Sequence, residues 1–422
     1  MQFFASAANP KFAQVCGALG CELRVQKRHY KDRVASVFID TEVRTNVPKM
    51  LTNFGIGTLA GINLGSAPDA GQRLQSGSQQ TSMSVNSSDT ASVVERTRPI
   101  VVGGGGAIVA AHFLGRTGAF VLGEEAIVLV PSDSDPRRVA VHSGAILTSV
   151  ADSARVITGG DDSKLVLTGA NGESRFLASD PKHRWIDQVA LGPDGAVAWS
   201  AGKTAYVQAK DQAKELRAYE APSTVGGLAF FPKGFRLAIA HYNGATLWFP
   251  NASGAIPEKL EWKGSHLGAT VSPDGRFLVT SMQEPMLHGW RLVDRQHMRM
   301  SGYATRVMSL AWTPGGQWLA TSGATQLVLW PFASKDGPMG KTPRLLTPSA
   351  HRIDVVACHP RSDVVAVGYT NGMVLLVRIE DGVEILAKKP GEEPITALAW
   401  SSDGLLLAWG TEAGEAGIID LA

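Results

Sequence analysis

Short apolar runs alternate with turn-forming residues through the last three quarters of the chain, and their order is repeated. The clearest copy is 267–290, LGATVSPDGRFLVTSMQEPMLHGW. It predicts a strand, a Ser-Pro-Asp-Gly turn, a second strand, a short loop and a third strand that ends at Trp290. Similar blocks open at Val307, Ile353 and Ile395. Repetition at about 40 residues is typical of a propeller or another repeat array.

Eight apolar segments open the repeats, with starts 38 to 46 residues apart: 108–113, 146–151, 186–191, 225–230, 267–271, 307–312, 353–358 and 395–400. Most lead into a four-residue turn, as in GPDG (192–195), SPDG (272–275) and SSDG (401–404). Pro, where present, presets φ at the first central position, and the last Gly accepts a positive φ. The Asn-Gly pairs at 243–244 and 371–372 predict hairpin turns between later strands.

Each repeat therefore predicts one four-stranded blade, whose apolar faces and open edges need neighbours. Radial packing of blades around an axis covers those faces and protects the edges. We expect an all-β propeller over residues 96–422, with eight blades favoured and seven as the alternative if the first repeat is something else. The last repeat has three strands, so an N-terminal strand at 100–102 is expected to complete it and close the ring.

Residues 1–95 do not share the repeat and form a non-repeat extension. They hold a basic run at 27–33, a predicted strand at 34–40, and a polar stretch at 79–92 that predicts linker or disorder. Residues 1–100 carry a net charge of +4 and the remainder −2. A solvated extension is the preferred interpretation, with contact to nucleic acid as the alternative. A start at Met83, with 1–82 as an upstream extension, is a further hypothesis that an intact-mass measurement tests.

Composition narrows the class of protein. The 422 residues are 44% hydrophobic and 18% charged, so a large core is available. A formal charge of +2 gives no electrostatic argument for nucleic acid or an anionic membrane as partner. The three Cys (16, 21 and 358), the lack of a long apolar run and the lack of a basic leader favour a reducing compartment without membrane insertion. We expect a cytoplasmic, monomeric propeller with protein partners and no cofactor.

Three features together carry a family resemblance: the repeat period, the SPDG-type turn, and a Trp that ends the third strand at Trp248, Trp290 and Trp330. Residues 100–422 resemble the WD40-repeat β-propellers. The position of the family's Gly-His pair is filled by His142, His266 and His351. The Trp-Asp pair is absent, because Phe, Arg and Pro follow the three Trp, so the family's Asp–His–Ser–Trp hydrogen-bond network is expected to be incomplete or missing.

Some blocks are more specifically similar to single-domain WD40 proteins of bacteria, namely LAIAHYNGATLWFPN, EWKGSHLG and LHGWRL. The resemblance implies a rigid scaffold without chemistry of its own, whose top face and rim bind proteins or peptides. We therefore expect a non-catalytic interaction scaffold that binds protein partners through its loops and top face.

Two clusters supply the candidate partner-binding residues. One is rich in Met and His, which would suit a soft metal such as Cu(I), but strand alternation separates these side chains, so packing or partner contact is preferred. The other holds aromatic residue types that are enriched at binding hot spots. The candidates are Tyr242, Asn243, Trp262, Lys263, His266, Met286, His288, His297, Met298, Met300 and Tyr303. Trp248 and Trp290 are interpreted as packing residues.

Enzyme motifs are missing from the sequence. The run of glycines at 103–106 lacks the Lys-Ser/Thr of a phosphate-binding loop, and neither G-x-S-x-G nor H-E-x-x-H occurs. We expect no catalytic residues and no metal ligands. The alternative is a propeller enzyme, hydrolase-like, with a metal or polar site in the central channel. Such a site would draw single residues from several repeats, which spacing cannot reveal.

Overall fold

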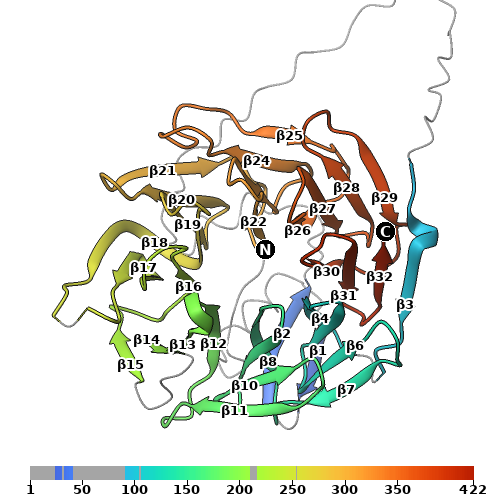
Figure 1. The fold of residues 1–422 in the computed structure, drawn as a ribbon, viewed down its shortest axis with the longest axis horizontal. Helices are drawn as coiled ribbons and strands as arrows, with labels where there is room; N and C mark the ends of the chain where they lie inside the picture. Colours follow the sequence, from blue (N-terminus) through green and yellow to red (C-terminus); the bar gives the residue numbers. More distant parts are fainter. Residues whose placement is uncertain (1–23, 31–32, 41–90, 104–105, 210–215, 253) are drawn as a thin grey trace, which may run out of the picture. The chain divides into compact units, whose positions relative to one another are not determined.

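The structure is a computed structural model, and it describes residues 24–30, 33–40, 91–103, 106–209, 216–252 and 254–422 (Figure 1). The chain divides into two compact units, Met1–Met83 and Ser84–Ala422. In the first unit, β1 (Arg24–Tyr30) and β2 (Arg33–Asp40) pair as an antiparallel hairpin, which confirms the strand expected at 34–40. Among the described residues, no helix is long and apolar enough to cross a membrane. Cys16 and Cys21 lie outside the described residues.

The second unit is a ring of antiparallel sheets (Figure 1). Three sheets come first in the chain: β4 (Ile108–Leu114), β5 (Thr117–Leu122), β6 (Ala126–Val130) and β7 (Arg137–Ala140); β8 (Ile146–Ala151), β9 (Arg155–Gly160), β10 (Lys164–Gly169) and β11 (Ser174–Ser179); β12 (Ile186–Leu191), β13 (Val197–Ala201), β14 (Thr204–Gln208) and β15 (Arg217–Glu220). A short 3-10 turn, η3 (Pro193–Gly195), links β12 to β13. The first strand of each sheet is the innermost, as the figure shows.

Three sheets come last: β22 (Leu310–Trp312), β23 (Trp318–Thr321), β24 (Leu327–Pro331) and β25 (Arg344–Leu346); β26 (Ile353–Cys358), β27 (Val364–Tyr369), β28 (Val374–Arg378) and β29 (Glu384–Lys388); β30 (Ile395–Trp400), β31 (Leu406–Thr411), β32 (Ala416–Asp420) and β3 (Thr97–Ile100). Between the two groups lies one sheet of six strands: β16 (Gly227–Phe230), β17 (Leu237–Trp248), β18 (Glu258–Val271), β19 (Phe277–Met282), β20 (Met286–Arg291) and β21 (Gln296–Ser301).

The expectation of eight blades is therefore wrong, because the described propeller has seven sheets. The cause does not lie in the first repeat, which forms the ordinary sheet β4–β7. Instead, β18 pairs with β17 through residues 258–265 and with β19 through residues 266–271. Two sequence repeats thus share one hydrogen-bonded sheet.

The long strands of that sheet contain sharp reversals. In β17, Asn243 has a φ of 66°, and the ring Nε2 of His241 lies 2.9 Å from Oγ1 of Thr246. In β18, Nε2 of His266 lies 3.0 Å from the carbonyl oxygen of Trp262. An extended strand would separate residues four or five positions apart by more than 10 Å, so the chain folds back at both places. The Asn-Gly pair at 243–244 therefore makes the hairpin turn that the sequence predicts.

Burial increases toward the middle of each sheet. The second strands β13, β19 and β31 are buried along their whole length, because neighbouring sheets cover both of their faces. The core consists of apolar layers between successive sheets, such as Ile108 and Phe120 packed with Leu406 and Ile418. The outer strands alternate between buried and exposed positions, as β21 does. The apolar runs of the sequence are thus explained by sheet-to-sheet packing.

The ring is closed by the N-terminal part of the propeller. β3 (Thr97–Ile100) pairs antiparallel with β32 and completes the last sheet. The predicted closing strand is therefore confirmed, but it consists of residues 97–100 instead of 100–102. Just before it, Leu386 of β29 accepts a hydrogen bond from the N–H of Val93 and donates one to the carbonyl of Ala91. The 3-10 turn η2 (Val94–Arg96) joins these two attachments. Residues 91–100 therefore link two neighbouring sheets at their outer edges.

Arginine side chains join neighbouring sheets at the outer rim. Four Arg residues at the beginning of an outer strand each donate a hydrogen bond to a backbone carbonyl 33 to 36 residues later, in the next sheet: Arg98 to Pro131 at 3.4 Å, Arg137 to Asn171 at 2.7 Å, Arg217 to Pro250 at 2.7 Å, and Arg344 to Glu380 at 2.9 Å. A carbonyl at the end of a third strand has no partner within its own sheet, so these contacts satisfy it.

Candidate functional site

The innermost strands lie side by side around the axis, with equivalent positions in contact. Oγ1 of Thr396 donates to the carbonyl of Ile108 in the first sheet. The N–H of Val356 donates to Oγ of Ser309 at 3.1 Å, and Nε1 of Trp312 donates to Oγ1 of Thr270 at 2.9 Å. Because neighbouring innermost strands run in the same direction, they all begin on one side of the ring. We call this side the entry face, and the opposite side the exit face.

A one-residue bulge recurs where these strands begin. The pairing between first and second strands shifts register at the same place in six repeats, and the skipped residues are Val109, Leu147, Asp187, Leu267, Asp354 and Thr396. A bulge leaves its extra residue out of the ladder and redirects its side chain. Met308 occupies the same place in the sixth repeat of the sequence, directly after the buried Val307. We call these seven residues the bulge ring.

The bulge ring mixes apolar and polar residues, and its exposed members are all apolar. Met308 is 67% exposed, and Val109 and Leu147 are exposed as well. The two carboxylates of the ring differ in environment. Burial raises the pKa of Asp187 above its usual value, although its own backbone N–H and the hydroxyl of Ser200 act against this. Asp354 forms an ion pair with Arg352, with Nε and Oδ1 2.5 Å apart.

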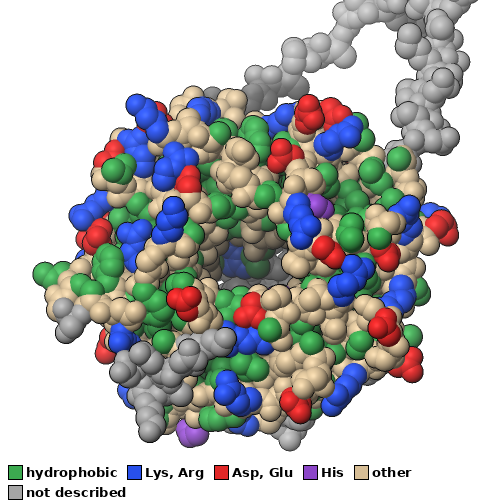
Figure 2. Space-filling model, viewed as in Figure 1, with side chains coloured by type: hydrophobic (Ala, Val, Ile, Leu, Met, Phe, Trp, Pro, Cys, Tyr) green, Lys and Arg blue, Asp and Glu red, His purple; other side chains and the backbone are tan. Residues whose placement is uncertain are grey.

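Two large aromatic side chains lie near the bulge ring on the entry face. Trp185, 62% exposed, directly precedes the first residue of β12. Tyr242, 58% exposed, lies at the reversal of β17 between a second and a third strand, which also belongs to the entry face. Figure 2 shows one face of the propeller, with charged side chains of both signs scattered over it and a hollow at the centre of the ring.

Three of the sequence-predicted candidates are exposed at this face. Tyr242 and Asn243 form the turn within β17, and Oδ1 of Asn243 accepts a hydrogen bond from the N–H of Gly264 at 3.2 Å. Lys263 lies at the neighbouring reversal of β18 and is exposed. The structure thus brings these three residues together in two adjacent turns.

Another group of candidates forms an aromatic cluster inside the six-stranded sheet. The ring of Trp262 stacks on His288, with centroids 4.1 Å apart, and contacts His297 at 4.7 Å. His288 also meets Trp290 edge-on, with centroids 4.8 Å apart. His266 is buried and bonded to Oγ1 of Thr280 at 2.7 Å. His297 is the exposed member, on outer strand β21.

His288 is the unusual member of this aromatic cluster. It is fully buried, and neither of its ring nitrogens has a hydrogen-bond partner among the described residues. Burial lowers its pKa to about 3, with further contributions from His266, His297 and Arg299. The ring is therefore neutral at physiological pH and packs as an aromatic side chain.

The remaining candidates belong mainly to the core. Met298 and Met300 are buried inward-facing residues of β21, in the layer against the next sheet. Tyr303 is buried in the same layer. Met286 begins β20 and is half-buried. The buried candidates Met298, Met300, Tyr303, His266 and His288 offer no surface to a partner, so the site described below does not include them.

The repeats contain different versions of one internal polar network. Nδ1 of His142 contacts Oδ1 of Asp162 at 2.9 Å, and its Nε2 contacts Oγ1 of Thr158 at 2.8 Å. His351, at the corresponding sequence position of another repeat, is exposed. Within the described repeats the network is thus incomplete, and in one of them it reaches from Asp through His to Thr without the Trp.

The described residues offer few side chains that could bind a metal ion or act as a nucleophile. Within the described residues, no group of three or more His, Cys, Asp or Glu side chains is placed to hold a metal ion. Cys358 is a half-buried free thiol in innermost strand β26, and burial raises its pKa to about 12. It is therefore protonated and a poor nucleophile at neutral pH.

Sequence reasoning missed the bulge ring and Trp185. A bulge adds one residue without changing the apolar character of a strand, so the pattern of the chain does not mark it. One signal was available: most first strands open with a large apolar residue, and the residue after it varies between apolar, acidic and small types. That variation at an otherwise regular position is what a solvent-facing site produces.

Comparison with known proteins agrees with this architecture. The family model described as "WD domain, G-beta repeat" matches residues 295–330, and the one described as "Anaphase-promoting complex subunit 4 WD40 domain" matches residues 352–422. No curated protein matches the sequence.

Solved structures share the fold at low identity. The computationally designed Ika8 protein is 16% identical, with a TM-score of 0.62 over 76% of this chain and 98% of that chain. The RRP9 WD40 repeats are 17% identical, with a TM-score of 0.52 over 70% and 100%. U3-55K is 18% identical, with a TM-score of 0.50 over 66% and 96%. These identities establish the fold alone.

Proposed function

We propose that this chain, which carries WD40 repeats in a β-propeller, is a non-catalytic cytoplasmic scaffold that binds a protein partner on its entry face. Propellers of this class generally mediate protein–protein interaction. The single observation that carries the proposal is the bulge ring, which presents side chains from most of the repeats at the beginning of the central channel.

The residue types at this face are those of a protein interface. Met and aromatic residues are enriched in interface cores, and Met308, Trp185 and Tyr242 are the large exposed members here. A rigid ring presents them with little loss of conformational freedom on binding. Polar Asn243 and Lys263 lie in the adjacent turns and would form part of a polar rim. His297, Met286 and the half-buried Trp262 are secondary candidates on the flank of the same sheet.

Affinity capture with matched variants tests the proposal. Wild-type protein is compared with Met308→Asp and Trp185→Asp, which place a charge on the entry face, and with Val293→Asp on the exit face. Val293 is 88% exposed in the turn between β20 and β21, so its substitution controls for a new surface charge. The proposal expects the same stoichiometric protein with wild type and Val293→Asp, and its loss with both entry-face variants. Equal capture by all four proteins contradicts it.

The alternative of a hydrolase-like enzyme at the channel stays a prediction. Such an enzyme requires acidic or His side chains that converge on one point. The two carboxylates of the bulge ring, Asp187 and Asp354, belong to the third and seventh repeats of the sequence, which are not neighbours. Elemental analysis for a divalent metal, together with hydrolysis assays on model esters and phosphates, addresses it directly. Nucleic acid is not proposed as a partner, since the protein is close to neutral overall.

A further inference from the structure

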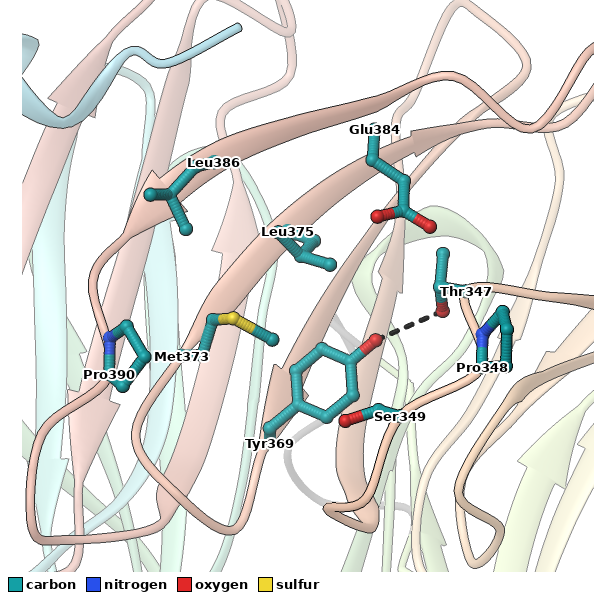
Figure 3. Close-up of a pocket in the computed structure, with 9 residues that line it drawn as sticks. All are labelled: Thr347, Pro348, Ser349, Tyr369, Met373, Leu375, Glu384, Leu386 and Pro390. Atoms are coloured by element: carbon teal, nitrogen blue, oxygen red, sulfur yellow. Dashed lines mark hydrogen bonds between the residues drawn. The ribbon is translucent and has the colours of Figure 1, made fainter. Parts of the chain in front are cut away.

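A pocket of about 300 Å³ lies between two neighbouring sheets at the outer rim (Figure 3). Its apolar wall is formed by Met373, Leu375 and Leu386, at or near β28 and β29, the third and fourth strands of their sheet. Its polar side is formed by Glu384, Tyr369 and Thr347. We call this cavity the rim pocket. It is separate from the bulge ring, whose residues begin the innermost strands.

The pocket exists because one outer strand ends early. β25 has three residues and stops at Leu346. Thr347 then takes a positive φ of 52° and Pro348 follows, so the chain leaves the sheet edge. The side of β29 that faces β25 is thereby left partly uncovered, with Glu384 and Leu386 half-buried. The free edge of β29 is held in place from outside, because residues 91–93 bond to Leu386.

The polar side of the rim pocket contains an unpaired carboxylate. Figure 3 shows the Glu384 side chain directed toward Tyr369 and Thr347. No hydrogen bond or ion pair reaches its carboxylate within the described part of the chain, and burial raises its pKa above the ordinary value of 4.5. The hydroxyl of Tyr369 donates to Oγ1 of Thr347 at 3.0 Å, so its oxygen lone pairs remain able to accept. Burial, opposed by this bond, raises the pKa of Tyr369, and the charge of Glu384 adds to the effect.

We propose that the rim pocket binds an arginine side chain of a partner polypeptide, with its guanidinium on Glu384 and its methylene stem against Met373, Leu375 and Leu386. A half-buried carboxylate without a partner is costly, and a cation that enters the pocket compensates for it. The Glu384 carboxylate accepts hydrogen bonds only, and the Tyr369 oxygen beside it can also accept, which favours a group with several N–H donors at this place.

Shape and hydration distinguish arginine from the other basic side chain. The planar guanidinium can donate to the Glu384 carboxylate and to the Tyr369 oxygen at once, whereas an ammonium group acts as a compact point charge. A guanidinium is also less strongly hydrated, so a pocket lined with apolar carbon removes its water more easily. A volume of about 300 Å³ lies at the lower limit for ligand pockets, which fits one side chain rather than a folded element.

Methyl NMR with small probes tests this proposal on the full-length protein. Methionine is labelled with ¹³C at the ε-methyl, and the signal of Met373 is assigned by its loss in Met373→Leu. N-acetyl-arginine amide is then titrated to millimolar concentrations. N-acetyl-citrulline amide, which has the same shape without the charge, and N-acetyl-lysine amide are the matched probes. Glu384→Gln removes the carboxylate charge, and Glu380→Gln removes an exposed one nearby as a control.

The expected result is a saturable shift of the Met373 signal with the arginine probe, in wild type, Glu380→Gln and Met308→Asp. Binding should weaken about tenfold or more with citrulline or in Glu384→Gln, since the charge-assisted hydrogen bonds are lost. An unresponsive Met373 signal, equal binding of citrulline, or undiminished binding by Glu384→Gln overturns the proposal. Stronger binding of the lysine probe overturns the assignment to arginine. Because Met308→Asp leaves the rim pocket intact, failure here and failure of the entry-face proposal are distinguishable.

Discussion

Nε1 of Trp330 donates a hydrogen bond to the hydroxyl oxygen of Tyr303 at 2.6 Å, in the interior of the propeller. The same hydroxyl lies 2.7 Å from Oγ1 of Thr321, which in turn donates to the carbonyl of Val328. Burial raises the pKa of Tyr303 to about 12, although its bonds to Thr321 and Trp330 act against this. Trp330, at the end of a third strand, is thus connected through Tyr303 to Thr321. In this repeat Tyr303 stands at the sequence position that His142 has in another repeat.

Tyr303→Phe removes the middle of this network while keeping the ring. It leaves the indole N–H of Trp330 and the hydroxyl of Thr321 to find other partners in a buried place, so we expect the free energy of unfolding to fall by about 1–3 kcal/mol. Chemical denaturation followed by Trp fluorescence measures the change. Tyr242→Phe, at an exposed hydroxyl, is the control and should leave stability unchanged. Equal stability of the two variants would show that the network is dispensable.

The arginine contacts between sheets predict a small, position-specific effect. Arg137→Ala removes the hydrogen bond to the carbonyl of Asn171 and should lower the free energy of unfolding by about 0.5–1.5 kcal/mol. Arg175→Ala, at an exposed position near the beginning of the next outer strand, should stay within about 0.5 kcal/mol of wild type. A parallel denaturation series compares them, and a larger loss in Arg175→Ala would reverse the assignment.

Asp162 predicts an acid-sensitive contribution. Burial alone would raise its pKa, but hydrogen bonds from Ser143, His142 and the N–H of Lys164 lower it to about 2. The unfolded chain therefore binds more protons between about pH 3.8 and pH 2, and stability falls as the pH is lowered through this window. Asp162→Asn should lose stability at neutral pH and show a flatter profile in that window. Asp161→Asn is the control, and a wild-type profile in Asp162→Asn would contradict the account.

His288 makes the opposite kind of prediction, since its substitution should cost little. The ring has no hydrogen bond to lose among the described residues, but Leu would lose its stacking on Trp262, so His288→Leu should change the free energy of unfolding at neutral pH by no more than about 1 kcal/mol in either direction. The pKa of about 3 lies below the ordinary 6.5, so the unfolded state binds more protons between these values. Stability of the wild type should fall as the pH drops through that range.

His288→Leu removes this part of the pH dependence, and His351→Leu at an exposed site should not. Thermal melts from pH 7 to pH 4 distinguish the two variants. A large loss of stability in His288→Leu at neutral pH would indicate a bond or ligand on the ring.

Much of the fold could be predicted because apolar periodicity reports burial directly. The innermost strands of all eight repeats were placed from Ile, Val and Leu residues at regular spacing, and each lies in a strand or directly precedes one. The closing strand could be predicted because the last repeat lacks a fourth strand. The blade count failed, since continuity of hydrogen bonding through Gly264 of β18 depends on local backbone geometry that hydrophobicity does not encode.

The candidate site was harder to predict, because unusual composition is a poor guide to exposure. Met298 and Met300 stood out as residue types. However, they alternate along β21 with the exposed His297 and Arg299, which is the pattern of a strand with one buried side. Tyr303 likewise replaces a His in an internal network. The exposed members, Met308 and Trp185, differ from their neighbours only by a position next to a bulge or strand start, which needs coordinates to see.

Site-specific photo-crosslinking tests the central claim most directly. A photoreactive amino acid replaces either Met308 on the entry face or Val293 on the exit face, both exposed, and the protein is irradiated in its own host. We expect a covalent adduct with a single protein partner from position 308 and none from position 293. An adduct with that partner from position 293, with none from position 308, would contradict binding at the entry face.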